Sequence, residues 1–102
     1  MPLAERFEHL AATFREDYPG RELDAGLLQR VCWWCADKPA PASVSAMSDG
    51  SVCLEWLGAG ESLIVQYRLN GGAVWAGSTG GRRPFGDGYP PASAWACLRH
   101  NT

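Results

Sequence analysis

Apolar residues follow a helical spacing over the first part of the chain. The pattern predicts an amphipathic helix over residues 3–17, which Pro19 and Gly20 end. A second helix is predicted over about residues 24–36, with Asp24 as its N-cap. The side chains expected to be buried are Leu3, Phe7, Leu10, Ala11 and Phe14 in the first helix and Leu27, Leu28, Val31, Trp34 and Cys35 in the second.

After Pro41 the spacing changes from helical to alternating, which is typical of strands. The turns, such as Asp49-Gly50 and Asn70-Gly71, are too short for crossover helices, so an antiparallel meander is expected. Two N-terminal helices packed on one face of a four-stranded sheet give a two-layer α+β fold. The four predicted strands cover residues 44–47, 51–57, 63–69 and 73–76.

The length of 102 residues fits a single domain, over residues 1–102. In this prediction residues 1–37 form the helical layer and residues 42–76 form the sheet. Residues 77–91 are rich in Gly and Pro and are expected to form one long irregular loop, a kind of segment that is often functional. The tail, residues 92–102, fits either a final strand or a short helix.

The stretch from Tyr18 to about Ala76 carries a recognisable pattern of motifs. An aromatic-x-Gly triplet, Tyr18-Pro19-Gly20, leads into the second helix and the link Pro39-Ala40-Pro41. A hairpin of the form Asp-Gly-x-Val-x-Leu-Glu-Trp follows at residues 49–56. In these features the chain resembles a group of small uncharacterised proteins of bacteria, phages and mobile elements. The resemblance implies the α+β fold and a microbial or phage origin, and it transfers no active site.

Charge is distributed unevenly along the chain. Residues 1–61 contain five Lys or Arg against ten Asp or Glu, whereas residues 62–102 contain four Arg against one Asp. A net charge of −2 argues against direct nucleic-acid binding, which depends on Lys and Arg. The acidic half favours a larger protein or ribonucleoprotein with a basic surface, although a solvated face is the alternative. The acidic binding candidates are Glu5, Glu8, Glu16 and Asp17.

The expected chemical state of the four cysteines depends on the cellular compartment. No segment has the apolar length of a bilayer span and no export signal is recognised, so a cytoplasmic protein with free thiols is expected. Four residues with ligand-like spacing form an alternative zinc site: Cys32, Cys35, Cys97 and His100. Ordinary packed thiols are favoured, because Cys35 lies on the apolar stripe of its helix. No cofactor is therefore predicted.

Catalysis has little support in the sequence. His9 and His100 match no catalytic motif, and no base–nucleophile pair is recognised. The Gly-rich stretch before Arg82 lacks a Walker lysine and a following helix, so nucleotide binding is not expected. A non-enzymatic protein is predicted.

The Gly- and Pro-rich loop contains residue types that are enriched at binding hot spots, although a solvated linker is the alternative. These residues are Arg82, Arg83, Phe85 and Tyr89. Trp33 lies off the buried stripe of its helix and is expected to be exposed. Trp75 is assigned to the open face of the sheet and is expected to be covered by the tail around Trp95.

These features favour a small binding protein that acts by protein–protein contact. The leading hypothesis is a phage or mobile-element inhibitor of a bacterial complex, of the anti-CRISPR or a related anti-defence type, acting as a monomer or homodimer. The alternatives are a zinc-stabilised adaptor, a self-associating module that pairs through a sheet edge, and an enzyme with an unrecognised site.

Overall fold

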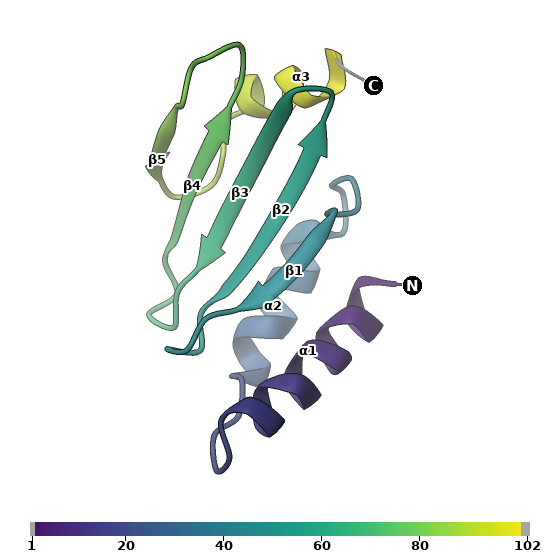
Figure 1. Cartoon of the computed structure of the whole chain (residues 1–102), viewed down its shortest axis with the longest axis vertical. Coiled ribbons are helices and arrows are strands. Elements are labelled where there is room, and N and C mark those ends of the chain that lie inside the picture. The colour runs from purple at the N-terminus through teal and green to yellow at the C-terminus, as the bar shows by residue number, and fades with distance from the viewer. Residues whose placement is uncertain (1, 101–102) are drawn as a thin grey trace.

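The computed structural model describes residues 2–100, except for the side chains of residues 96, 97, 99 and 100. This part of the chain forms three helices and five strands (Figure 1). The helices are α1 (Leu3–Asp17), α2 (Ala25–Cys35) and α3 (Ala92–His100). The strands are β1 (Ser43–Ala46), β2 (Val52–Gly58), β3 (Glu61–Tyr67), β4 (Ala73–Ser78) and β5 (Phe85–Asp87).

The strands form one antiparallel sheet in the order β1-β2-β3-β4-β5. The predicted α+β class and the antiparallel meander are confirmed. The predicted number of four strands is wrong, because β5 adds a fifth strand beside β4. The third helix also lies outside the predicted pair of N-terminal helices.

Both N-terminal helices form where the apolar spacing predicts them. α1 has the predicted bounds, and Phe7 and Phe14 are its buried side chains. At the start of α2, Oδ1 of Asp24 accepts hydrogen bonds from the backbone N–H groups of Gly26 (2.8 Å) and Leu27 (3.1 Å). These bonds satisfy two donors that have no partner inside the helix, so Asp24 is the N-cap that the sequence predicts.

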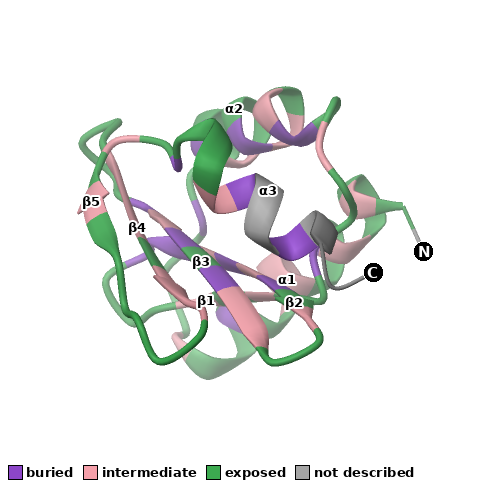
Figure 2. Ribbon diagram, turned by 90° about the horizontal axis from the view of Figure 1, so that it is seen from above, coloured by how far each residue is buried: buried purple, intermediate pink, exposed green. Residues whose placement is uncertain are grey.

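The hydrophobic core lies between the helices and one face of the sheet. Alternate residues of β2 and β3 point into it, and α2 and α3 lie on that side of the sheet (Figures 1 and 2). The strand residues that point into the core are Val52, Leu54 and Trp56 in β2 and Leu63, Val65 and Tyr67 in β3. α1 packs beside β1, and the Arg6 guanidinium donates hydrogen bonds to the carbonyls of Pro41 (2.7 Å) and Ala42 (3.3 Å).

The segment 77–91 is more ordered than the predicted irregular loop. β4 extends to Ser78, a tight turn joins Thr79 to Arg82, and β5 follows. In the tail, the open choice between strand and helix is settled by α3, whose Trp95 and Leu98 enter the core. The loop prediction failed because Gly and Pro hide the short strand from any alternation of apolar residues.

Trp75 lies on the core side of the sheet and not on its open face, because it pairs with Val65 of β3 and Gly86 of β5. It is half-buried against the core and lines a small cavity together with Ala94 of α3. The predicted position on the open face is therefore wrong, and cover by the tail around Trp95 stays a prediction. A Cβ atom at Gly86 would lie 2.8 Å from Nε1 of Trp75. Glycine at this position therefore makes room for the indole.

Trp34 connects the elements of the core through aromatic contacts. Its ring stacks on Tyr89, with centroids 4.9 Å apart and planes 20° apart. The rings of Tyr67, Trp95 and Trp56 lie 5.7, 6.0 and 6.2 Å from it. Among the described residues the Tyr67 hydroxyl has no hydrogen-bond partner, and burial raises its pKa. This cluster joins α2, β2 and β3 to the segment that leads into α3.

Within residues 2–100, no helix has both the length and the apolar character that a membrane span requires.

Candidate functional site

The second face of the sheet is open. Because side chains alternate along a strand, the residues between the core positions point away from the helices. Figure 1 is drawn looking onto this side, with α2 and α3 behind the sheet, and no described helix lies over β2–β5. We call this surface the open face, and its central residues are Cys53, Glu55 and Leu57 of β2, Ser62, Ile64 and Gln66 of β3, Val74, Ala76 and Ser78 of β4, and Phe85 and Asp87 of β5.

Four apolar side chains of the open face follow one another across the sheet. The strand register places Ile64 beside Ala76, and Ala76 beside Phe85. On β2 the residue directly opposite Ile64 is Glu55, whereas Leu57 is opposite Ser62 and is a diagonal neighbour of Ile64, at about 7–8 Å. Side chains opposite each other on neighbouring strands are in contact range, with Cβ atoms about 5 Å apart. We call these four apolar residues the apolar stripe.

The side chains of the apolar stripe are well exposed. Phe85 is 82% exposed, Leu57 60% and Ile64 39%. By contrast, the neighbouring strand residues Trp56 and Leu63 are 3% and 1% exposed. The stripe therefore contributes apolar surface to solvent on a sheet whose other face is buried.

Two carboxylates lie along one side of the apolar stripe. Glu55 is opposite Ile64 in the register, and Asp87 is two residues after Phe85 on β5. None of the strands β1–β5 contains Lys or Arg. The nearest basic residues in sequence are outside the strands: Arg82 and Arg83 in the turn before β5, and Arg68 after β3. The strands thus present apolar, hydroxyl and acidic groups.

The edges of the sheet offer little room for another strand. α1 packs along β1, and the Arg6 guanidinium donates hydrogen bonds to two backbone carbonyls just before that strand. At the opposite edge, β5 has three residues and follows Pro84, while Pro90 comes shortly after it. Short edge strands with nearby proline and charge are typical of edges that are protected from pairing. This geometry gives the self-associating alternative less support than the open face gives to binding by a face.

The acidic candidates of α1 form a separate surface. Glu5, Glu8, Glu16 and Asp17 are all exposed, as expected for a solvated helix face. Figure 1 places α1 at the β1 side of the sheet, whereas the turn before β5 is at the far end of the sheet. The acidic helix and the basic turn are therefore not brought together into one site.

The aromatic and basic candidates have different environments. Trp33 is 82% exposed on α2, which agrees with the sequence, but it lies on the helical side of the molecule. Arg82 and Arg83 are exposed at the turn between β4 and β5. Tyr89 stacks on Trp34 and is only half exposed, so part of its ring serves the core. Phe85 belongs to β5 and to the apolar stripe.

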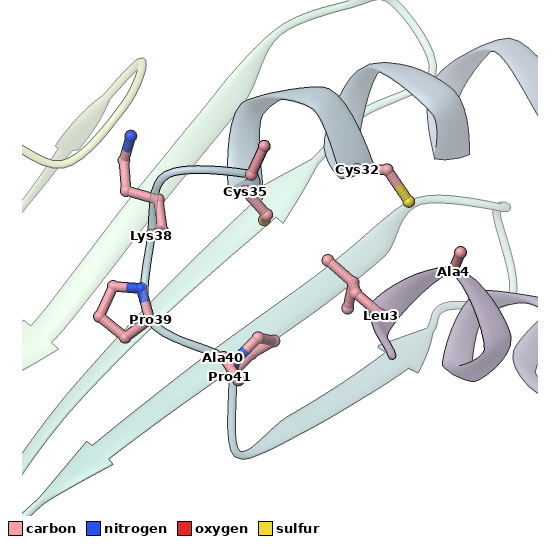
Figure 3. A pocket seen from close by; sticks show the side chains of 9 residues that line it. Leu3, Ala4, Cys32, Cys35, Lys38, Pro39, Ala40 and Pro41 are labelled. Atoms are coloured by element: carbon pink, nitrogen blue, oxygen red, sulfur yellow. The ribbon is translucent and has the colours of Figure 1, made fainter. Parts of the chain in front are cut away.

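Cys32 and Cys35 line a cavity of about 340 Å³ between α2 and the link to β1 (Figure 3). Leu3, Pro39 and Pro41 give the cavity an apolar wall. Burial raises the pKa of the Cys35 thiol to about 12 and also raises the pKa of Cys32, so both remain protonated near neutral pH.

The zinc alternative receives no support from the described residues, among which no group of three His, Cys, Asp or Glu could hold a metal ion. The side chains of Cys97 and His100, the other two candidate ligands, lie outside the described part.

The described residues form no recognisable catalytic arrangement. Glu55, Glu61 and Asp87 lie on three different strands, β2, β3 and β5. His9 is exposed on α1. What the open face offers chemically is contact: apolar area for burial, with carboxylates and hydroxyls around it to orient a partner.

Sequence reasoning missed most of this site. The sequence predicts Phe85 as a binding residue but none of Glu55, Leu57, Ile64 and Asp87. Every second residue of a predicted strand points away from the core. Apolar residues at these positions, where a solvated face would have polar ones, are the signal that could have identified the site.

In comparisons with protein-family models, with curated proteins and with solved structures, no match to this chain was found.

Proposed function

We propose that this chain is a non-enzymatic protein-binding module, and that its open face is the binding surface. One observation carries the proposal: the apolar stripe is exposed on the face of a sheet whose opposite face holds the core. Burial of an exposed Phe or Leu side chain contributes roughly 1.5–3 kcal/mol. Burial of the apolar stripe against a partner would therefore favour a complex.

Contiguity distinguishes the stripe from ordinary surface hydrophobics. Single apolar residues on a surface are common, whereas a continuous patch rimmed by polar groups is typical of an interaction site. The sheet register places Ile64, Ala76 and Phe85 side by side on three strands, with Leu57 of β2 as a diagonal neighbour of Ile64. The strands are in turn held by the buried face, so the surface is preorganised for a partner.

The biological form that we propose for this binding is inhibition of a larger bacterial complex, of the anti-CRISPR or a related anti-defence type. A small domain with one preorganised face inhibits by occupying a surface that the complex needs. The support for this form is the charge of the open face, whose strand residues include Glu55 and Asp87 and no Lys or Arg, which favours a partner with a basic surface.

The proposal is tested with variants that change the open face without changing its charge. Phe85→Ser combined with Ile64→Thr removes apolar area and keeps a β-branched residue in β3. The matched control is Glu5→Gln combined with Glu8→Gln, which changes the exposed face of α1. Each protein is immobilised and exposed to extract of a bacterium that carries defence systems, and retained proteins are quantified by mass spectrometry. Circular dichroism confirms that each variant is folded.

We expect proteins retained by the wild type to be lost with the open-face variant and kept with the α1 control. Retention that is equal for the wild type and the open-face variant contradicts the proposal. Retention that is lost only with the α1 variant moves the binding surface to the acidic helix.

A further inference from the structure

We propose that the occupant of the open face is an amphipathic helix of a partner protein that carries Lys or Arg along one flank. The inference rests on the proposed function and specifies the partner's chemistry. It follows from three properties of the open face: its shape, its charge and the position of the charge relative to the apolar stripe.

The edges of the sheet favour a helix over a strand as the occupant. An added strand needs a free edge, and here α1 packs along β1 while β5 is three residues long. Hydrogen bonds to β4 already use backbone groups at both ends of β5, since the N–H of Gly77 donates to the Pro84 carbonyl (2.8 Å) and the N–H of Gly88 donates to the Ala73 carbonyl (2.7 Å). Little more than the backbone groups of Phe85 and Asp87 is left for pairing with another strand. A helix instead packs on the face of a sheet, as α2 and α3 do on the other side.

The charge of the open face favours a basic partner. Glu55 and Asp87 are the charged side chains among its strand residues, and no Lys or Arg occurs in β1–β5. A second copy of this chain would offer no Lys or Arg from its own strands to pair with these carboxylates. A cationic flank on a different protein would pair with both of them.

The carboxylates also indicate how the charges of the partner are arranged. In the register, both lie on the same side of the apolar stripe, Glu55 at its β2 end and Asp87 at its β5 end. The stripe crosses three strand spacings, about 14 Å at about 4.8 Å each. A helix of about ten residues has this length, at 1.5 Å per residue. The inferred ligand therefore has an apolar face of three turns and basic residues near both ends of one flank.

Two synthetic helical peptides with the same apolar residues test this inference, one with Lys and the other with Glu at the flank positions. Binding to the intact chain is measured by fluorescence anisotropy. The decisive variant is Glu55→Gln with Asp87→Asn, and its matched control is Glu5→Gln with Glu8→Gln. Both double variants remove two carboxylates, so they change the total charge equally. A third protein, Phe85→Ser, removes apolar area alone.

We expect saturable binding of the Lys peptide and none of the Glu peptide. Loss of the open-face carboxylates is expected to weaken binding about fivefold, since each exposed ion pair contributes modestly. The α1 control is expected to stay within about twofold, and higher salt is expected to weaken the wild-type complex.

Other results would overturn the inference in distinguishable ways. Equal weakening by the two carboxylate variants, or no binding of the Lys peptide, contradicts the basic helix as the occupant. Equal binding of the Glu and Lys peptides that Phe85→Ser removes would leave the open face as the binding surface and reject only the inferred charge. Binding of the Lys peptide that Phe85→Ser leaves unchanged contradicts the proposed function itself.

Discussion

The two faces of the same sheet differ sharply although they are built from alternating residues of the same strands. In β2, Leu54 and Trp56 are 0% and 3% exposed, whereas Leu57 is 60% exposed. In β3, Leu63 is buried and its neighbour Ile64 is not. Residues one position apart therefore serve different purposes: one set stabilises the fold against the helices, and the other is left available for contact.

This difference indicates which residues folding requires. A core side chain gains stability from burial, so its apolar character follows from the fold. Phe85 is 82% exposed and gains little from folding, so its apolar character is unexplained by stability. The proposed binding function would account for it, and the contrast between the faces can be tested residue by residue.

The largest expected effect is on the core side of β2. Leu54→Ala leaves a cavity and is expected to lower the free energy of unfolding by about 3 kcal/mol. Leu57→Ala, on the open face of the same strand, is expected to lower it by less than about 1 kcal/mol. Urea denaturation of both variants measures the difference, and equal losses would show that Leu57 also belongs to the core.

A second contrast concerns added volume. Gly86→Val places methyl groups where the Trp75 indole lies and is expected to destabilise the protein by about 2 kcal/mol. Ala76→Val adds two methyl groups on the open face one strand away, where β-branched residues suit a strand, so a change of less than about 0.5 kcal/mol is expected. Thermal denaturation compares the two, and an unaffected Gly86→Val protein would contradict the close packing of Trp75.

Two exposed aromatic residues sharpen the comparison further. Tyr89→Ala removes the ring that stacks on Trp34 and is expected to cost about 1 kcal/mol of stability. Phe85→Ala is expected to change stability by less than about 0.5 kcal/mol, because its ring makes no such stacking contact within the described residues. Chemical denaturation, with replicate measurements of each unfolding midpoint, gives the change in stability for both variants. A cost at Phe85 above that at Tyr89 would assign Phe85 a structural role.

The thiols provide a chemical comparison of the two sides. Burial raises the pKa values of Cys32 and Cys53, and it raises that of Cys35 to about 12. Because the thiolate is the reactive form, Cys35 on the core side is expected to be alkylated by iodoacetamide more slowly than Cys32 and Cys53 at pH 8. Site-resolved mass spectrometry measures the rates. Reaction of Cys35 before Cys53, on the open face, would contradict the burial described here.

The smallest expected effect is on pH dependence, at the turn between β1 and β2. Hydrogen bonds from the Ser51 hydroxyl (2.6 Å) and N–H (2.9 Å) lower the pKa of Asp49. A lowered pKa in the folded state adds stability above the ordinary carboxyl pKa, and this contribution is lost as the pH falls through the folded value. Asp49→Asn keeps an acceptor but does not titrate. The difference in melting temperature between the two proteins should therefore shrink below about pH 4; a constant difference would contradict this account.

The sequence predicted the parts of the fold that local periodicity encodes. The helical spacing of apolar residues predicted the bounds of α1, and Asp24 predicted the start of α2. β5 was not predicted, because Phe85, Gly86 and Asp87 contain no alternation and Gly86 is required by the distant Trp75. Predicting the open face as a site requires knowing that Ala76 pairs with Phe85, and no local pattern specifies this pairing between strands. The alternation of β3 indicates that Ile64 points away from the core, but only the pairing of the strands shows which residues lie beside it on the surface.

The most direct test of the central claim is chemical-shift mapping of the ¹⁵N-labelled chain with the Lys-flanked peptide. The account predicts that the perturbed amide signals belong to β2–β5, around Ile64, Ala76 and Phe85, while the indole signal of Trp33 and the amides of α1 stay in place. Perturbations that gather on α1 or around Trp33 and spare the open face would contradict it.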